Sequence, residues 1–229
     1  MAMSAKRFKA IFFDLDGTLI DIRGPLYASV RYAFDCMGAE PALTRERYEE
    51  LLLREGLSLG VAESQRRQYA KLVLSHFMAQ AQDAQFEILP EVPEALTELK
   101  RRNYTTGVVT SRPGDAEAIS YKLNACGLAG LLDHVLTARI NNLSALDKTE
   151  SLALACERAG VLSAHCAYVG DEPRDTMAAR NAKFGMAIAV ATGAAGFEHL
   201  RGHPEFKPGH VLHSMGQLPE LMARLDLDD

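Results

Sequence analysis

The sequence predicts an α/β protein: a parallel sheet with helices on both faces, joined to a small all-helical unit. Short apolar runs alternate with segments of helical period over most of the chain, which is typical of βαβ units. Several of these runs end directly in Asp or Thr. One long stretch, residues 21–89, contains helical patterns but no convincing strand. Together these observations predict a Rossmann-like core from residues 1–20 and 90–229, interrupted by a helical cap domain at 21–89.

The elements of the core follow one another as strand and helix. In open parallel sheets ligands bind outside the carboxyl ends of the strands, so polar residues at those ends are candidates for a site. The expected strands are 10–14, 105–110, 134–138, 167–170, 186–191 and 210–212. The expected helices of the core are 92–102, 113–126, 148–159, 174–183 and 217–225.

The stretch 21–89 is expected to hold three helices above the carboxyl edge of the sheet. A structureless loop of this length inside a compact protein would be unusual. Apolar residues recur at helical spacing, and Gly and Pro separate the segments. The segments with this spacing are 26–37, 48–52 and 69–77.

Composition excludes several classes of partner. The chain has 229 residues, 48% hydrophobic and 24% charged, with a formal net charge of −5, as in a globular protein with a substantial core. The cap stretch carries eight Lys or Arg and ten Asp or Glu, so it offers no basic surface to nucleic acid or membrane. No apolar run reaches the length of a membrane span. The state expected in solution is a monomer or a homodimer.

The cysteines and the N-terminus favour a cytoplasmic location. The four cysteines show no CxxC spacing, lie among apolar residues and are expected to be reduced thiols of the core. The first ten residues contain no apolar segment of the kind found in secretory signals. The cysteines are Cys36, Cys126, Cys156 and Cys166.

Two acids stand at the end of the first expected strand, in KAIFFDLDGTL. Burying a carboxylate is costly unless it is paired, hydrogen-bonded or bound to a metal. Asp14 and Asp16 are two apart, which on an extended chain places both on one side. Two close acids can divide the work, one as nucleophile or metal ligand and the other as general acid. The alternative is a pair of solvated loop acids.

The next two candidates are hydroxyl and basic groups. The second strand ends GVVTSRPG, where Thr110, Ser111 and the free N–H groups of a following helix would form an anion site. Arg112 and, further along the chain, Arg174 border the predicted site and could contact the substrate, and the alternative for both is a solvated loop arginine. Lys148, in SALDKTES, lies at a helix start, where a cation opposes the helix dipole and an anionic ligand would explain it. The alternatives are simple helix caps and a solvated surface lysine.

A second pair of acids follows another strand, in CAYVGDEPRDT. Asp171 and Asp175 would then face the same edge as Asp14. Converging carboxylates suit a hard cation, and Mg²⁺ prefers such oxygen ligands. The sequence therefore predicts a Mg²⁺ site at this edge of the sheet.

The four motifs together resemble the haloacid dehalogenase superfamily. DLDGT, a strand-terminal threonine, an isolated lysine and GDxxxD occur in that order, with a helical cap after the first motif. The chain is similar over essentially its whole length, most of all to the phosphoglycolate-phosphatase-like members. The resemblance implies a Mg²⁺-dependent phosphatase that hydrolyses a small phosphorylated metabolite.

For catalysis, the resemblance implies that Asp14 is the nucleophile and forms an aspartyl-phosphate. Asp16 would protonate the leaving oxygen and then activate water. Thr110 would hold the phosphoryl oxygens with Ser111, and Lys148 would stabilise the charge on nucleophile and phosphate. This division agrees with phosphoryl transfer as a matter of positioning and charge neutralisation.

For the metal, the resemblance implies that Asp171 binds Mg²⁺ with Asp14 and the backbone carbonyl of Asp16. Asp175 would hold a metal-bound water or orient Lys148. Asp16 also argues for phosphate rather than halide chemistry, since dehalogenases need no acid at that position.

Two other functions stay open, and one is disfavoured. A sugar phosphomutase shares Asp14 and Asp16, and an inactive binding protein could keep the same fold. A phosphonatase would need a cap lysine in an apolar setting, and the single cap lysine, Lys71, lies among polar residues.

The cap is expected to close over the site and to set specificity. Hinges are expected at 20–24 and 89–93, where the chain enters and leaves the cap. The segment 54–67 is expected to dip toward the site, so that Arg66 or Arg67 meets the remote end of the substrate.

Overall fold

The computed structural model describes most of the chain. The predicted strand end at Ala138, the helix start at Pro113 and the loop residue Gly56 lie outside the described residues. The described residues are 6–38, 43–55, 58–83, 85–112, 115–137, 147–207 and 209–227.

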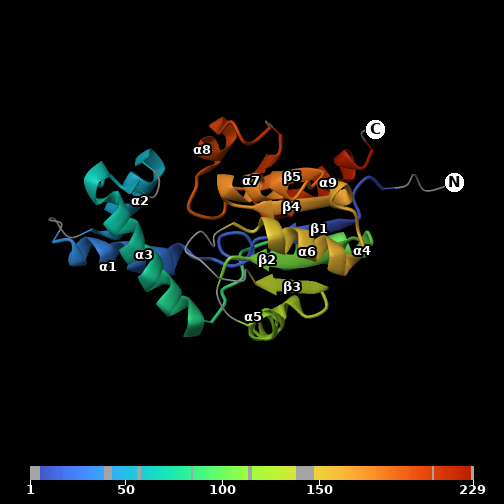
Figure 1. Cartoon of the computed structure of the whole chain (residues 1–229), viewed down its shortest axis with the longest axis horizontal. Helices are drawn as coiled ribbons and strands as arrows, with labels where there is room; N and C mark the ends of the chain where they lie inside the picture. Colours follow the sequence, from blue (N-terminus) through green and yellow to red (C-terminus); the bar gives the residue numbers. More distant parts are fainter. Residues whose placement is uncertain are drawn as a thin grey trace.

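Six parallel strands form the sheet at the centre of the fold (Figure 1). They are β1 (Ala10–Phe13), β2 (Thr105–Thr110), β3 (His134–Thr137), β4 (Cys166–Gly170), β5 (Met186–Val190) and β6 (Val211–Leu212). The order across the sheet is β3-β2-β1-β4-β5-β6, and each neighbouring pair is parallel. β1 is therefore central, with β2 on one side and β4 on the other. The predicted parallel α/β fold is confirmed.

Helices cover both faces of the sheet and also form a group beside it (Figure 1). One helix, α8, has no counterpart in the sequence prediction. The helices are α1 (Arg23–Cys36), α2 (Arg45–Glu55), α3 (Glu63–Asp83), α4 (Val92–Arg101), α5 (Ala116–Leu123), α6 (Thr149–Ala159), α7 (Pro173–Asn181), α8 (Phe197–Gly202) and α9 (Leu218–Leu225), with short turns of other helical types at Asn124–Leu128, Ser163–His165 and Met215–Gln217.

Successive side chains of the central strands point to opposite faces of the sheet. Ile11 and Phe13 of β1 join one apolar cluster with residues of α4, α5 and α9. Ala10 and Phe12 join a second cluster with residues of α6 and α7. Because both clusters are buried, β1 is apolar on both faces, which is why its sequence shows a continuous apolar run.

The stretch between β1 and α4 has an apolar cluster of its own, and we call residues 21–89 the helical insertion. Leu26, Val30 and Ala33 of α1 pack with Tyr48 of α2 and Tyr69 of α3. Figure 1 shows these three helices grouped at one end of the sheet. The predicted three helices are confirmed.

The two chain crossings into the helical insertion run side by side. The Leu89 N–H donates to the Leu19 carbonyl at 3.0 Å, and the Asp21 N–H donates to the Glu87 carbonyl at 2.8 Å. Ile20 and Ile88 form an antiparallel bridge between them. A short two-stranded connection therefore joins the insertion to the sheet.

Two details of the sequence prediction are wrong. The helix expected at 113–126 begins as α5 at Ala116 and gives way at Asn124 to a π-helical turn, in which Gly127 has a φ of 90°. Cys36 is exposed at the end of α1, whereas Cys156 and Cys166 are buried as expected. Of the helices described, none combines the length and apolar character needed to cross a membrane.

Phe12 fills the space between β1 and the α6–α7 face, and its removal should destabilise the protein. The ring is fully buried, lies over Gly107 of β2 and contacts Phe184 edge-on at 6.1 Å between ring centroids. Phe12→Ala should lower the free energy of unfolding by about 3–5 kcal/mol in urea denaturation. Tyr121→Ala is the matched control, because Tyr121 is 76% exposed and its change should stay within about 0.5 kcal/mol. Equal losses in the two variants would contradict this packing.

Candidate active site

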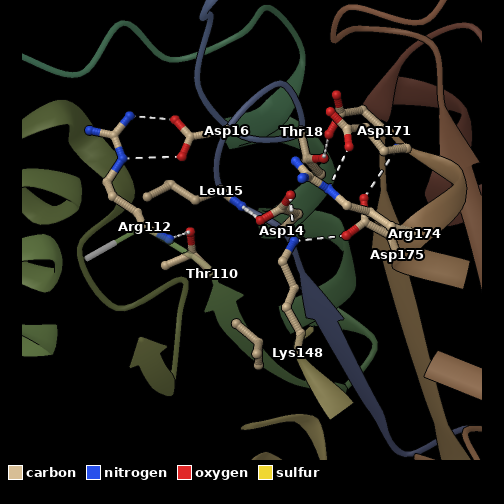
Figure 2. A network of polar contacts seen from close by, with 12 residues as sticks. Asp14, Leu15, Asp16, Thr18, Thr110, Arg112, Lys148, Asp171, Arg174 and Asp175 are labelled. Atoms are coloured by element: carbon tan, nitrogen blue, oxygen red, sulfur yellow. Dashed lines mark hydrogen bonds and ion pairs between the residues drawn. The ribbon is translucent and has the colours of Figure 1, made fainter. Parts of the chain in front are cut away.

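Five of the predicted residues meet at the carboxyl end of the sheet. Asp14 directly follows β1, Thr110 ends β2, and Asp171 directly follows β4. Asp175 lies in the first turn of α7, and Lys148 is the residue before α6. Parallel strands bring these distant parts of the chain to one edge (Figure 2).

Lys148 forms the centre of this group. Its side chain is only 1% exposed, and its Nζ lies 2.7 Å from Asp14 Oδ2 and 2.7 Å from Asp175 Oδ1. Burial alone would lower the pKa of Lys148, but Asp14 and Asp175 raise it well above its ordinary value. The lysine is therefore a permanent buried cation, and the alternative of a solvated surface lysine is wrong.

Asp14, Asp171 and Asp175 form a buried carboxylate cluster, in which one oxygen from each lies within 4.8 Å of the others. Burial raises the pKa of Asp171 well above its ordinary value, and Asp175 raises it further. Burial likewise raises the pKa of Asp14 to about 7, although Lys148 opposes this change. Like charges held this close need a cation, and an all-oxygen donor set fits a hard divalent ion such as Mg²⁺.

The backbone approaches this cluster closely at glycines. A Cβ on Gly193 would lie 1.7 Å from Asp171 Oδ2, and a Cβ on Gly17 would lie 2.5 Å from the same oxygen. Gly17 also has a φ of 77°, which disfavours other residues. Thr192 Oγ1 donates to the Gly17 carbonyl at 2.7 Å and joins the two loops. Only glycine fits beside Asp171 at both positions.

Asp16 lies outside the carboxylate cluster and is paired with Arg112. The guanidinium contacts both carboxylate oxygens, with Nε 3.1 Å from Oδ2 (Figure 2). Phe86 lies under the guanidinium, with its ring centroid 5.2 Å from the Arg112 Cζ. Arg112 is buried, so the reading of it as a solvated loop arginine is wrong. The metal role expected for the Asp16 carbonyl stays a prediction.

Thr110 is buried at the end of β2 and does not cap the next helix. Its Oγ1 accepts a hydrogen bond from the Arg112 N–H at 3.0 Å. The N-cap of α5 is Asp115, whose side chain accepts from the Glu117 N–H. Thr110 is thus available to the site, and it orders the backbone that carries Ser111.

A cavity of about 430 Å³ lies between the charged edge and the helical insertion. Asp14, Asp16, Ser111 and Arg112 line it from the sheet side. Arg66 also lines the cavity, from α3 of the insertion. Its size falls within the range of small-molecule sites, roughly 300–1,000 Å³.

Two other basic residues of the insertion, Arg67 and Lys71, lie outside the described lining of the cavity. Arg67 is exposed and is not among the described residues that line the cavity. Lys71 is also exposed and absent from that lining, which agrees with the argument against a phosphonatase.

Several residues of the site were missed from the sequence. Tyr168 of β4 places its ring 5.7 Å from Lys148 Nζ, and its hydroxyl donates to the Val109 carbonyl at 2.9 Å. Glu172 and Arg174 line the cavity and pair with each other, with 2.5 Å between Oε2 and Nε. Gly193 belongs to a loop far along the chain. Arg174 was expected to border the site, whereas Tyr168, Glu172 and Gly193 were missed. Of these three, only Glu172 carried a signal, because it lies inside the GDxxxD motif.

Acidic groups outnumber basic groups around the cavity and the cluster. Among the described residues, five carboxylates face four cations, so the site as a whole attracts a further cation. The carboxylates are Asp14, Asp16, Asp171, Glu172 and Asp175, and the cations are Arg66, Arg112, Lys148 and Arg174.

Comparison with known proteins agrees with this architecture. A family model described as haloacid dehalogenase-like hydrolase matches residues 11–189. Pyrophosphatase PpaX of Bacillus velezensis is 31% identical over 222 residues, covering 94% of this chain and 97% of the relative. N-acetylmuramic acid 6-phosphate phosphatase of Pseudomonas aeruginosa is 26% identical, covering 91% and 89%. The relatives thus match along nearly their full lengths.

A solved structure shows the same fold. A haloacid dehalogenase-like family hydrolase from Streptococcus pneumoniae superposes with a TM-score of 0.66 at 19% identity. The match covers 93% of this chain and 97% of that one.

The excess of buried carboxylates should destabilise the metal-free protein as the pH rises. The pKa of Asp14 is about 7 in the folded chain against an ordinary 3.8, so the folded state binds more protons between these values. The contribution of Asp14 to the free energy of unfolding therefore falls as the pH rises from about 4 to about 7. Asp171→Asn should relieve the repulsion and stabilise the metal-free protein at about pH 8 by about 1–3 kcal/mol.

Thermal unfolding with EDTA and with Mg²⁺ measures this prediction. The variant should melt about 2–4 °C higher per kcal/mol in EDTA, and Mg²⁺ should stabilise it much less than the native protein. Asp35→Asn, at an exposed position of α1, is the control and should melt like the native protein in both buffers. A lower melting temperature for Asp171→Asn in EDTA would contradict the prediction, because it would show that the charge of Asp171 stabilises the metal-free protein.

Proposed function

The chain belongs to the haloacid dehalogenase-like hydrolase family, and we propose that it is a Mg²⁺-dependent phosphatase acting on a small phosphomonoester. The observation that supports this most is the buried Lys148 held between Asp14 and Asp175. This arrangement sets a carboxylate nucleophile beside a fixed cation at the floor of a cavity. The names of its relatives, among them a phosphoglycolate phosphatase, also favour phosphate chemistry.

In the first step, a carboxylate oxygen of Asp14 attacks phosphorus and the bond to the ester oxygen breaks. Lys148 and the Leu15 N–H, which donates to Asp14 Oδ1 at 2.7 Å, hold the nucleophile in place. Asp16 gives its proton to the departing alkoxide, so an alcohol leaves and an aspartyl-phosphate remains on Asp14. Thr110 and Ser111 donate to the phosphoryl oxygens.

In the second step, Asp16 takes a proton from water, which attacks the phosphorus of the aspartyl-phosphate. The Asp14 carboxylate and inorganic phosphate are regenerated. Arg112 matters to both steps, because its guanidinium contacts both carboxylate oxygens of Asp16. Asp16 must therefore turn away from Arg112 to reach the leaving oxygen in the first step and the water in the second.

The carboxylates of Asp14 and Asp171 would hold Mg²⁺, with Asp175 placed to bind its water or to orient Lys148. When bound, the ion would neutralise charge on the phosphoryl oxygens and align them with the nucleophile.

We also propose that residues 1–20 and 90–229 form the catalytic core and that the helical insertion is a cap domain. The paired crossings at Leu19–Leu89 and Asp21–Glu87 are where the cap would hinge. Closure would exclude bulk water during the first step. The buried free thiols of Cys156 and Cys166 favour a cytoplasmic location for this enzyme.

Hydrolysis of p-nitrophenyl phosphate tests the activity directly. We expect turnover with Mg²⁺ and loss of at least about 90% of it in excess EDTA, because the buried carboxylates repel the substrate phosphate without a cation. An inactive binding protein would give no turnover above the no-enzyme rate. A sugar phosphomutase would convert a sugar phosphate to its isomer faster than it releases phosphate.

Substitution of Asp14 and of Asp16 should reduce the activity toward different esters by different amounts. Asp14→Asn should reduce kcat by at least about a thousandfold for every ester, because an amide cannot attack phosphorus. Asp16→Asn should slow alkyl esters by about 10²–10⁴-fold and p-nitrophenyl phosphate much less, because p-nitrophenolate leaves without a proton. Asp35→Asn, on the exposed side of α1, is the control. Full activity of Asp14→Asn would exclude the covalent mechanism.

A further inference from the structure

The cavity has a charged floor and an apolar wall. The floor comes from the strand ends, where Asp14, Asp16, Ser111 and Arg112 line it. The opposite wall comes largely from the helical insertion, and its main element is α3. The two halves therefore face different parts of a bound ester: the floor meets the phosphate and the wall meets the leaving group.

Two adjacent rows of α3 form this wall. Residues four apart lie one above the other on a helix, so each row is one ridge of the same face. The rows are Tyr69, Val73 and Phe77, and Ala70, Leu74 and Met78. The first row also packs inside the protein, since Tyr69 and Val73 join the apolar cluster of the insertion.

The second row has no such packing role. Ala70 is exposed, and Leu74 is 39% exposed, one of the few large apolar side chains among the described residues with that much free surface. An apolar ridge that faces a cavity instead of a neighbouring helix is a surface for a ligand. Ile22 and Leu26, at and near the start of α1, continue the apolar wall.

Polar groups are few on this side of the cavity. Among the described lining residues of the insertion, Ser58, Arg66 and Tyr69 carry polar atoms. The Tyr69 hydroxyl is buried and has no hydrogen-bond partner among the described residues. Arg66 is exposed at the helix start, where its Nε donates to the Val61 carbonyl at 3.3 Å. Among the described lining residues of the insertion, these three polar groups are fewer than the convergent hydrogen-bond donors that a sugar or a second anionic group requires.

We propose that the substrate is a phosphomonoester with an uncharged, apolar leaving group of at least about four carbon atoms, seated along the ridge of Ala70, Leu74 and Met78. This inference rests on the proposed phosphatase activity and names the substrate class of the same site. Short esters with a second anionic group, such as phosphoglycolate, would leave the ridge in contact with water. Each buried methylene gains about 0.8 kcal/mol, which corresponds to as much as about fourfold in kcat/KM.

A homologous series of alkyl phosphates tests the proposal, because the chemistry at phosphorus stays constant along it. With methyl, ethyl, butyl and hexyl phosphate, kcat/KM should rise by about two- to fourfold per methylene until the chain fills the cavity. Phosphoglycolate should react more slowly than butyl phosphate. A flat series, or a preference for phosphoglycolate, would overturn the proposal while leaving a phosphatase.

Binding of alkylphosphonates tests the apolar site independently of ester hydrolysis. These molecules keep the anionic head and cannot be hydrolysed. By calorimetry in Mg²⁺, hexylphosphonate should bind at least about thirtyfold more tightly than methylphosphonate, with a more negative heat-capacity change. If the phosphonates bind in this order but no ester is hydrolysed, the proposed phosphatase fails and the apolar site stands. Equal binding of the two would overturn the apolar site.

Two variants test whether residues of α3 cause the preference for longer alkyl chains. Leu74→Asn should lower kcat/KM for hexyl phosphate by about three- to tenfold more than for methyl phosphate, and Ala70→Asn should act in the same direction. Both residues are exposed, so folding should survive, and the melting temperature checks this. Leu162→Asn is the matched control, because Leu162 is 74% exposed and lies outside the cavity lining. An equal loss for both esters in the α3 variants would place the leaving group elsewhere.

Discussion

Lys148 is a positive charge in the interior of the protein, and the arrangement of the site depends on it. Its Nζ lies 2.7 Å from a carboxylate of Asp14 and 2.7 Å from one of Asp175. Removing one partner of a buried ion pair is strongly destabilising, because the other charge is left uncompensated. The three residues come from different segments of the chain, so their attraction also holds the start of α6 and α7 against the end of β1.

The same charges limit what can surround them. One lysine cannot neutralise Asp14, Asp171 and Asp175, and the raised pKa values of Asp14 and Asp171 express the remaining repulsion. The backbone at Gly17 and Gly193 comes so close to Asp171 that no other side chain fits. A small divalent ion is therefore a better solution for this space than a second basic side chain.

The sequence predicted the parts of this site that depend on local pattern. An apolar run ending in an acid marks a strand end, and strand ends of a parallel sheet meet at one edge, so Asp14, Thr110 and Asp171 could be placed together. The pairing of individual side chains was not predicted in the same way: Asp16 pairs with Arg112 across 96 positions, and no local pattern marks this ion pair. The exposure of Cys36 and the change from α-helix to π-turn after Leu123 depend on where helices end, which periodicity defines poorly.

The charged floor and the apolar wall of the cavity are built by independent parts of the chain. The floor is fixed by ion pairs between strand ends, so a substitution there disturbs charge balance as well as catalysis. The ridge of Ala70, Leu74 and Met78 contributes little to the core, because the neighbouring row of Tyr69 and Val73 is the part of α3 that packs in the apolar cluster with α1. Substitutions in this ridge can therefore change the shape and polarity of the wall at small cost in stability. A cavity divided in this way can exchange one leaving group for another while the chemistry at phosphorus stays the same.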